Sequence, residues 1–381
     1  MSHQEEEAAK QITLICLSQW FQSLCTVARQ SSRKDEHRRA PPTTPIRLVE
    51  SLGDTQLDPS ELKQNVAQNT SASKETVLYL AYGSNLCRET FREKRGIRPI
   101  SQVNVVVPQL VMTFDLPGLP YTEPCFSNTR YRQVPACESN PETSEKERYH
   151  KDAWHKGLVG VVYEVTLADY AHIIATEGGG ASYKDVLVDC HALPDDPSIL
   201  VPISPSGTPF RAHTLFAPAV LTPDRGRLTR PDPSYAQPSP RYLKLITDGA
   251  NELTLPYEYQ VYLHSIRGYQ LTSTKQQLGQ FIFLSIWAPL LAFIFGAGRL
   301  FADKKGRYPS WLTTLAANIF IGMWASYDSF FKGLFGDGER TKEPGSSNQL
   351  MDEKQPLLVA TTRSKSKDVP DARVIPPETI V

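Results

Sequence analysis

Residues 77–88 read Val-Leu-Tyr-Leu-Ala-Tyr-Gly-Ser-Asn-Leu-Cys-Arg, an apolar run that breaks into a small polar turn. Strand-forming residues over 77–81, followed by Tyr82-Gly83-Ser84-Asn85, predict a buried strand that opens into a loop. Such a loop presents backbone N–H groups, small side chains and the start of a helix, which together suit binding of a carboxylate. An ordinary turn between a strand and a helix has the same pattern, so this stretch alone is consistent with both interpretations.

Short apolar runs elsewhere predict further strands, at 103–107, 110–114, 157–165, 183–191 and 210–216. Helices are expected at 89–94, 167–176, 241–248 and 256–262. The segment 117–156 is rich in proline and charge, and we expect it to be an insertion. Mixed short strands with few helices predict an α+β domain over 76–266 that is built on a small barrel or curled sheet.

Charge and cysteine content narrow the class of protein. The formal net charge of the 381 residues is +0 at pH 7, so no global field attracts nucleic acid, and we expect no nucleic-acid partner. The six cysteines contain no Cys-x-x-Cys pair and resemble neither a zinc site nor a dense disulfide framework. We therefore expect no metal site, and reduced thiols in a domain that faces the cytosol.

Both ends of the chain predict little packed structure. Residues 12–28 are moderately apolar after an acidic start, so we expect an amphipathic helix within 1–28 rather than a secretory signal. Over 29–75 the composition turns basic, then Pro/Thr-rich, then polar, which predicts a disordered linker. The polar segment 335–381 predicts a disordered tail.

Residues 276–298 run for 23 positions without a charged side chain. At about 1.5 Å per residue, a helix of this length crosses a hydrocarbon core of about 30 Å, and we predict a transmembrane helix here. A buried core helix is the alternative. The uncharged but more polar run 308–327 predicts a second transmembrane or interfacial helix. Basic residues flank the pair on both sides, so charge does not set its topology.

A second stretch places a carboxylate before three glycines: Ile173-Ile-Ala-Thr-Glu-Gly-Gly-Gly-Ala-Ser-Tyr183. Glycines let a substrate approach the backbone closely, and partial desolvation would raise the pKa of Glu177 towards that of a useful base. A solvent-exposed glutamate at the end of a helix, with glycines that merely terminate it, is the alternative. The run lacks the Gly-x-Gly-x-x-Gly pattern of a phosphate-binding loop.

Other reactive side chains have no recognisable partners in the sequence. His172, His191 and His213 are isolated, and nothing beside Cys87 supplies a base that would activate its thiol. Tyr242 stands in the run Pro238-Ser-Pro-Arg-Tyr242, where it would form one wall of a small-molecule site or pack in the core.

Three motifs together resemble the γ-glutamylcyclotransferases. Tyr79-Leu-Ala-Tyr-Gly-Ser-Asn-Leu86 is similar to the signature loop of that family. Glu177-Gly178 resembles its catalytic glutamate, which follows a Gly-Val-Val-Tyr strand that is here 160–163. The runs 238–250 and 255–260 resemble its C-terminal block. The motifs stand in the family's order within 76–266, about half of the chain.

The resemblance implies an α+β fold with a small mixed β-barrel and peripheral helices, and neither a metal nor an organic cofactor. It implies Glu177 as the catalytic residue. The residues that it implies for substrate binding are Tyr79, Leu80, Ala81, Tyr82, Gly83, Ser84, Asn85, Tyr183 and Tyr242. The spacing from Glu177 to Tyr183 is one residue shorter than in the family. Arg211-Ala212-His213 stands where human-type enzymes carry a pocket tyrosine after an Arg-Ser pair, so the substrate is expected to differ.

The implied activity is that of a cyclising lyase or acyltransferase. The α-amine of a γ-glutamyl amide attacks the side-chain carbonyl and releases 5-oxoproline with a free amino acid or amine. Similar fungal enzymes process glutathione adducts in secondary metabolism, and His213 would leave room for such a bulky substrate. The alternatives are a relative specific for glutathione or γ-glutamylamines, and a non-catalytic membrane-anchored module that binds γ-glutamyl compounds or a protein. We expect a membrane protein, held through 276–298, whose catalytic domain lies in the cytosol.

Overall fold

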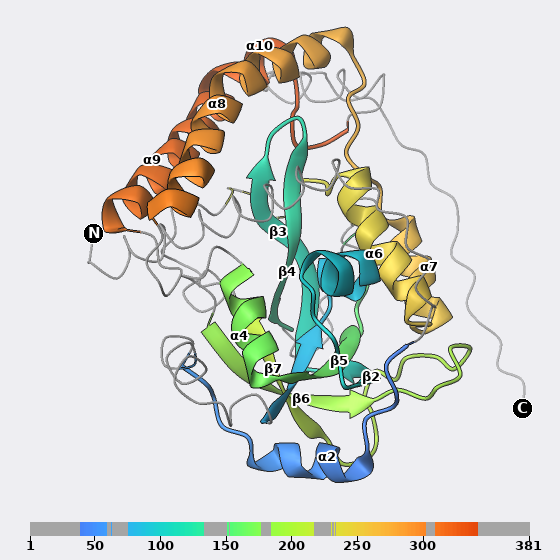
Figure 1. Ribbon diagram of the computed structural model, residues 1–381. Coiled ribbons are helices and arrows are strands. Elements are labelled where there is room, and N and C mark those ends of the chain that lie inside the picture. The colour runs from blue at the N-terminus through green and yellow to red at the C-terminus, as the bar shows by residue number, and fades with distance from the viewer. Residues whose placement is uncertain are drawn as a thin grey trace, which may run out of the picture. The chain divides into compact units, whose positions relative to one another are not determined.

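The computed structural model describes residues 39–58, 62, 75–132, 151, 153–176, 184–216, 230, 232, 234–301 and 309–341. All of these belong to one compact unit, 1–341 (Figure 1). The amphipathic helix expected within 1–28 and the tail beyond 341 lie outside the described residues.

Five strands form the central sheet: β1 (Thr76–Ala81), β2 (Ser101–Val107), β5 (Leu158–Thr166), β6 (Lys184–Ala192) and β7 (Phe210–Phe216). Their order is β1-β5-β2-β6-β7, and β1 returns to β7 through one parallel pair, Tyr79 with His213, which closes the sheet into a barrel. The remaining pairings are antiparallel. Apolar side chains on both faces bury most of β1 and β5, as their continuous apolar runs predict. The predicted α+β class with a mixed sheet is confirmed.

A separate hairpin, β3 (Leu110–Leu119) and β4 (Glu123–Tyr131), forms a two-stranded sheet. We predicted a strand only over 110–114 and an insertion from residue 117, so the sequence interpretation of 117–131 as irregular is wrong. Pro117 and Pro124 account for the error. Proline cannot donate a ladder hydrogen bond, but each strand of a two-stranded sheet has a free edge where that loss is tolerated.

Helices pack around the barrel. α4 (Leu167–Thr176) follows β5 and contacts both β1 and β5. α6 (Pro240–Glu252) begins with Ser239 as its cap, whose hydroxyl accepts from the Tyr242 N–H at 3.0 Å, and α7 (Tyr257–Ser265) follows it. α6 approaches the loop after β1 so closely that a Cβ on Gly249 would lie 2.5 Å from the Cys87 nitrogen. A glycine is therefore required at this crossing.

The predicted linker over 29–75 is wrong for residues 39–58. This segment carries α2 (Pro45–Glu50) and a 3-10 turn, η2 (Ser51–Gly53). The Thr44 hydroxyl caps α2 and Pro45 opens it, a start signal that the polar composition of the segment masks. The segment is bonded to the sheet: the Leu57 N–H donates to Asp185 at 2.7 Å.

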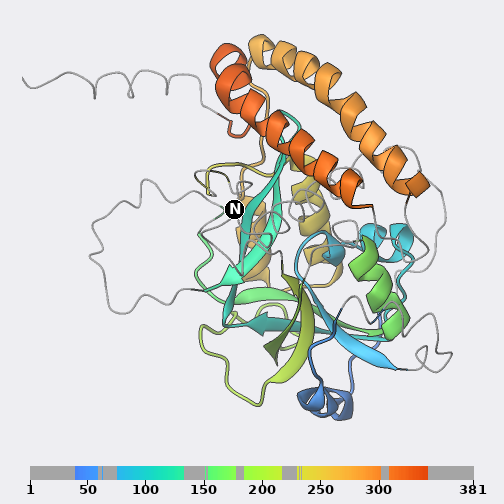
Figure 2. The same cartoon turned by 90° about the vertical axis from the view of Figure 1, so that its left-hand side faces the viewer.

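Two long helices complete the unit, α8 (Thr274–Phe301) and α9 (Ser310–Ser326), which lie side by side (Figure 2). The π-helix η8 (Tyr327–Phe331) and α10 (Lys332–Phe335) continue α9. The helix over 274–298 is long and apolar enough to cross a membrane, by length and composition. Residues 336–341, which we predicted to be part of a disordered tail, instead make hydrogen bonds, among them Gly338 N–H to the Tyr327 hydroxyl at 2.8 Å.

Candidate functional site

The loop after β1 turns sharply at Gly83 into a short 3-10 helix, η4 (Ser84–Leu86). The Leu86 N–H donates to the Gly83 carbonyl at 3.0 Å and the Cys87 N–H to that of Ser84 at 3.2 Å, which fixes the turn. Gly83 is buried, and a Cβ at this position would lie 2.5 Å from the Ser127 Oγ. The loop therefore favours glycine for packing reasons, because the Ser127 side chain of β4 lies directly against it.

Ser127 of β4 and Tyr242 of α6 meet at this turn. Their hydroxyl oxygens are 2.6 Å apart, and the Ser127 N–H donates to the Tyr242 hydroxyl at 3.3 Å. A Cβ on Gly83 would lie 3.6 Å from the Tyr242 hydroxyl, so the tyrosine and the loop, both singled out from the sequence, are neighbours in space. The sequence did not predict Ser127 as a site residue, because only the pairing of β3 with β4 brings it to this turn.

The residues of the signature loop differ in accessibility. Tyr79, Leu80 and Ala81 are buried in the sheet, whereas Tyr82 and Ser84 are half-buried. Asn85 is buried, and its side-chain amide donates to the Tyr79 hydroxyl at 2.9 Å. Tyr79 and Asn85 thus stabilise the loop from within, and Tyr82 and Ser84 are its partly exposed residues.

His213 is buried beside this loop, with 1% of its surface exposed. Its Nδ1 lies 2.9 Å from the Asp185 carboxylate, which also accepts from the Tyr170 hydroxyl at 2.5 Å. Tyr170 in turn packs against Tyr79, with ring centroids 5.8 Å apart. His213 therefore joins a buried hydrogen-bonded cluster under α4, and its replacement of a pocket tyrosine supplies no argument for a bulky substrate.

Glu177 and Tyr183 lie in 177–183, outside the described residues. The described residues on either side, Thr176 and Lys184, show where the chain enters and leaves this segment. α4 ends at Thr176, whose hydroxyl accepts from the Arg95 guanidinium at 2.6 Å. Arg95 directly follows the π-helix η5 (Glu89–Lys94), which itself follows the loop of Gly83. The end of α4 is therefore bonded to the segment that continues from the signature loop.

Cys87, which closes the signature loop, is not an activated nucleophile. Burial raises the pKa of its thiol, and the nearby Glu252 carboxylate raises it further. A thiol with a raised pKa is a poor nucleophile at neutral pH. Within the described ranges, no three His, Cys, Asp or Glu side chains are grouped so that they could hold a metal ion.

Comparison with known proteins gives matches over both the barrel and the C-terminal helices. A family model described as "AclK C-terminal domain" matches residues 273–334. "Gamma-glutamyl cyclotransferase aclK" of Aspergillus oryzae is 32% identical over 270 residues, 69% of this chain and 90% of the relative. "Gamma-glutamyl cyclotransferase gliK" of Aspergillus fumigatus is 30% identical over 267 residues, 70% of this chain and 90% of that relative.

Two solved structures match the chain at lower sequence identity. One described as "Gamma-glutamyl cyclotransferase" is 20% identical with a TM-score of 0.34, and covers 52% of this chain and 93% of its own. A yeast γ-glutamyl cyclotransferase described as specific to glutathione is 11% identical with a TM-score of 0.31, and covers 50% of this chain and 95% of its own.

Proposed function

The chain belongs to the γ-glutamyl cyclotransferase family and is an enzyme of this type, and we propose that it acts on a γ-glutamyl amide at the loop of Gly83. The observation that supports this location is the meeting of Gly83, Ser127 and Tyr242, three residues from β1, β4 and α6. The products would be 5-oxoproline and a free amino acid or amine. Glutathione-derived adducts belong to the same substrate class, since they carry the same γ-glutamyl bond.

The loop's task would be to fold the substrate. A γ-glutamyl amide carries its own nucleophile, the α-amine, which must reach the side-chain carbonyl to close a five-membered ring. Backbone N–H groups around Gly83 would bind the α-carboxylate and hold the amine near the carbonyl carbon. Intramolecular reactions in such a geometry gain about 7–11 kcal/mol over the bimolecular equivalent. The substrate already has part of this advantage, because its amine and carbonyl belong to one molecule, and the loop would add to it by holding the two groups in the reactive geometry.

The proton transfers would fall to Glu177. Its carboxylate would accept a proton from the α-ammonium group, which frees the amine for attack, and would then deliver a proton to the departing amine. The hydroxyl pair of Ser127 and Tyr242, which lies against Gly83, would orient the substrate beside the loop. One carboxylate suffices because no covalent enzyme intermediate forms.

Release of 5-oxoproline from a substrate panel tests the proposal, with the purified full chain. The panel comprises γ-glutamyl amino acids, γ-glutamylamines, glutathione and a glutathione conjugate. Glu177→Gln should lower the rate about 10²–10⁴-fold, the usual contribution of a general base. Asp195→Asn, which alters an exposed carboxylate in the turn after β6, is the matched control and should retain the wild-type rate.

A Glu177→Gln variant that folds and turns over normally would remove Glu177 from the mechanism. If the full chain bound γ-glutamyl compounds tightly but turned over none of the panel, a binding module would replace the catalytic proposal. The member of the panel with the highest kcat/KM identifies the leaving group.

A further inference from the structure

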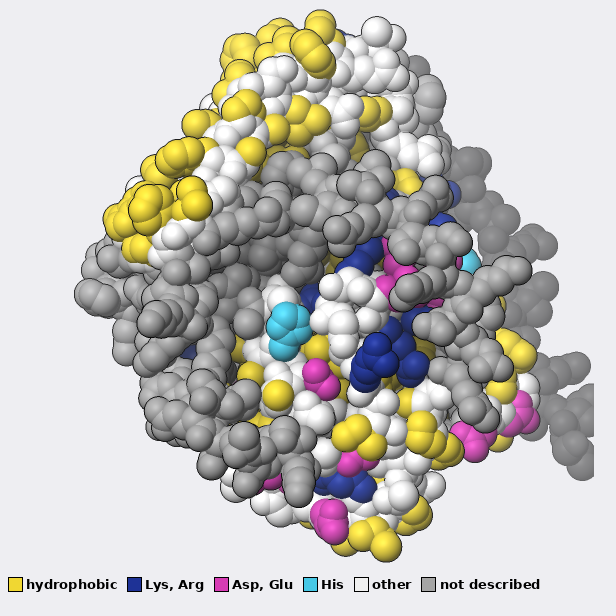
Figure 3. All heavy atoms as spheres, viewed as in Figure 1, with side chains coloured by type: hydrophobic (Ala, Val, Ile, Leu, Met, Phe, Trp, Pro, Cys, Tyr) yellow, Lys and Arg dark blue, Asp and Glu magenta, His cyan; other side chains and the backbone are white. Residues whose placement is uncertain are grey.

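The pair of helices α8 and α9, called the helical hairpin below, has a surface unlike that of a water-soluble domain. Three α8 side chains are largely exposed: Phe281 at 70%, Phe293 at 59% and Leu300 at 81%. No charged residue occurs in 276–298 or in α9. Hydrophobic side chains accordingly lie along the edge of the molecule that the helical hairpin forms (Figure 3). An exposed apolar surface of this extent marks a site of interaction.

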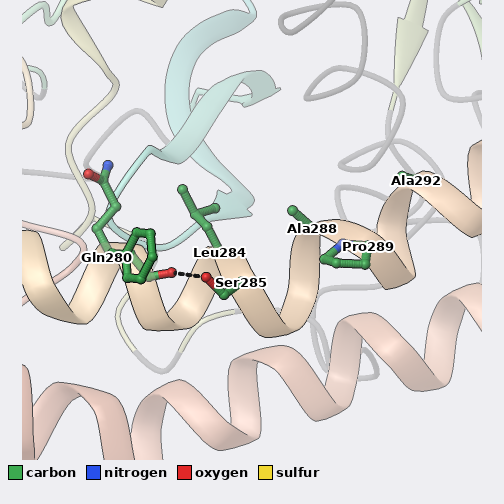
Figure 4. Close-up of a pocket in the computed structure, with 7 residues that line it drawn as sticks. Gln280, Leu284, Ser285, Ala288, Pro289 and Ala292 are labelled. Carbon is green, nitrogen blue, oxygen red and sulfur yellow. Dashed lines mark hydrogen bonds between the residues drawn. The ribbon is translucent and has the colours of Figure 1, made fainter.

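α8 does not have the burial of a core helix, whereas α9 is the more buried helix of the two, with Leu312, Ala316 and Phe320 among its buried side chains. Only 29% of the apolar window within 274–298 is buried inside the protein, whereas the core helix of a soluble domain is mostly buried. One row of α8 side chains, at Phe283, Leu291 and Ile294, is buried, and the opposite side is open. That side holds a shallow groove of 580 Å³ between Phe281 and Ala292, floored in part by Pro289 (Figure 4).

Two serine hydroxyls of the helical hairpin bond to its own backbone. The Ser285 hydroxyl donates to the Phe281 carbonyl at 2.8 Å, as Figure 4 shows, and Ser326 donates to the Met323 carbonyl at 2.8 Å. Hydroxyls that are satisfied within their own helix need no water, which is how serine is accommodated in a hydrocarbon environment. These contacts favour lipid as the covering partner over a hydrated protein surface.

The part of α8 that follows Gln280 is about as long as the hydrocarbon core of a bilayer is thick. Near the start of α8, the Gln280 amide donates to the Tyr121 carbonyl of the β3–β4 turn at 2.8 Å. The residues from Phe281 to Phe301 then extend for about 30 Å at about 1.5 Å per residue, the thickness of a hydrocarbon core. Charge returns only at Arg299, and the sequence beyond it carries Asp303, Lys304, Lys305 and Arg307.

Both ends of the helical hairpin are attached to the same part of the molecule. The Gln276 amide at the start of α8 donates to the Asp337 carbonyl at 2.9 Å. Tyr121 lies in the β3–β4 turn, and its hydroxyl donates to the Gly336 carbonyl at 2.9 Å. The backbone N–H of Tyr121 donates to the Gly338 carbonyl at 2.8 Å. The chain therefore leaves the catalytic domain at α8 and returns to it after α10.

We propose that the helical hairpin inserts into a lipid bilayer from the side of the catalytic domain, crosses it twice, and returns residue 341 to that same side. The catalytic domain and the C-terminal end of the chain then share one compartment, and the segment between Phe301 and Ser310 faces the other. This topology does not depend on the catalytic proposal, because 5-oxoproline release is measured in detergent with the same protein.

Insertion is tested by expressing the full chain in cells, isolating membranes and washing them at high pH. The chain should stay in the membrane pellet. Phe293→Lys should shift the ratio of pelleted to soluble protein about a hundredfold towards the soluble fraction, since a lysine at mid-bilayer depth is costly. Val261→Lys, which replaces an apolar residue of α7 that is 70% exposed, is the matched control and should leave the ratio unchanged. Equal ratios for the two variants, or a soluble wild-type chain, would overturn the proposal.

Topology is tested with one specific protease site at a time in sealed vesicles, inserted after Ser206 in the catalytic domain, after Lys305, or after Ser346. In intact vesicles the sites after Ser206 and Ser346 should either both be cut or both be protected. The site after Lys305 should be protected when they are cut, and cut when they are protected. Detergent should make all three sites accessible. Opposite accessibility of the Ser206 and Ser346 sites would indicate a single crossing and contradict the proposal. Cutting of all three sites without detergent would show that the helical hairpin does not cross.

Discussion

Gly83→Ala tests whether the loop and the Ser127–Tyr242 pair act as one unit. The new Cβ would lie 2.5 Å from the Ser127 Oγ, and ordinary contact begins at 3.4 Å, so the hydroxyl must move by about 0.9 Å. Rotation of the serine relieves the clash but breaks its 2.6 Å hydrogen bond with Tyr242. Leaving a buried polar group unpaired costs about 1–3 kcal/mol. For a domain of this size that lowers Tm by about 2–12 °C.

The same change should lower kcat/KM for 5-oxoproline release about a hundredfold, because a shift of about 1 Å at a positioning group has effects of this size. Gly53→Ala is the matched control, since a Cβ at Gly53 meets no atom within 4 Å. It should leave both Tm and kcat/KM unchanged.

A double-mutant cycle with Ser127→Ala tests whether the contact with the Ser127 hydroxyl causes these losses. In Ser127→Ala the clashing oxygen is absent, and the next neighbours of a Cβ on Gly83 are 3.6 and 3.7 Å away, which is ordinary contact. Adding Gly83→Ala to Ser127→Ala should therefore cost almost no stability, so the double-mutant cycle shows a coupling of about 1–3 kcal/mol. Equal losses in the two backgrounds, or a wild-type rate for Gly83→Ala alone, would refute the reasoning.

Three further changes follow from other contacts. Tyr242→Phe removes the hydroxyl that pairs with Ser127, and kcat/KM should fall about tenfold while the fold, measured by circular dichroism, is retained. Tyr121→Phe removes a hydroxyl that contacts two carbonyl oxygens, and we expect a loss of about 1–3 kcal/mol in urea unfolding; no loss would mean that the contact is dispensable. Burial raises the pKa of the Cys125 thiol to about 12, so the folded state keeps this proton after the unfolded state has lost it. Stability should therefore fall as pH rises above about 8.5, by up to ~1.4 kcal/mol per unit for this thiol, and Cys125→Ala should show a shallower decline.

The sequence predicted the elements whose signals are local. The apolar run 77–81 is within β1, and the helix expected over 167–176 has the bounds of α4. The β3–β4 hairpin was missed beyond residue 114, because its prolines read as loop when their position at a free edge is unknown. Periodicity within a segment does not show which strands have free edges.

The candidate site was predictable to a similar degree. Gly83 and Tyr242 each lie in a recognisable motif, and the structure brings them together. Ser127 lies in no motif, and its place depends on a strand pairing that is set by the whole fold. His213 showed the opposite case, where a conspicuous substitution in a motif turned out to be a buried partner of Asp185.

The contact of Tyr121 with the C-terminal helices also sets an order in time. Tyr121 bonds to the carbonyl of Gly336, 215 residues further along the chain. At about 5–20 residues per second, the ribosome makes Gly336 about 10–40 s after Tyr121. The β3–β4 turn must wait through that interval without its final partners, although β1 and β5 are already available to pair. The β3–β4 turn therefore acquires its last hydrogen bonds only after α10 has been synthesised, although β3 and β4 can pair with each other much earlier.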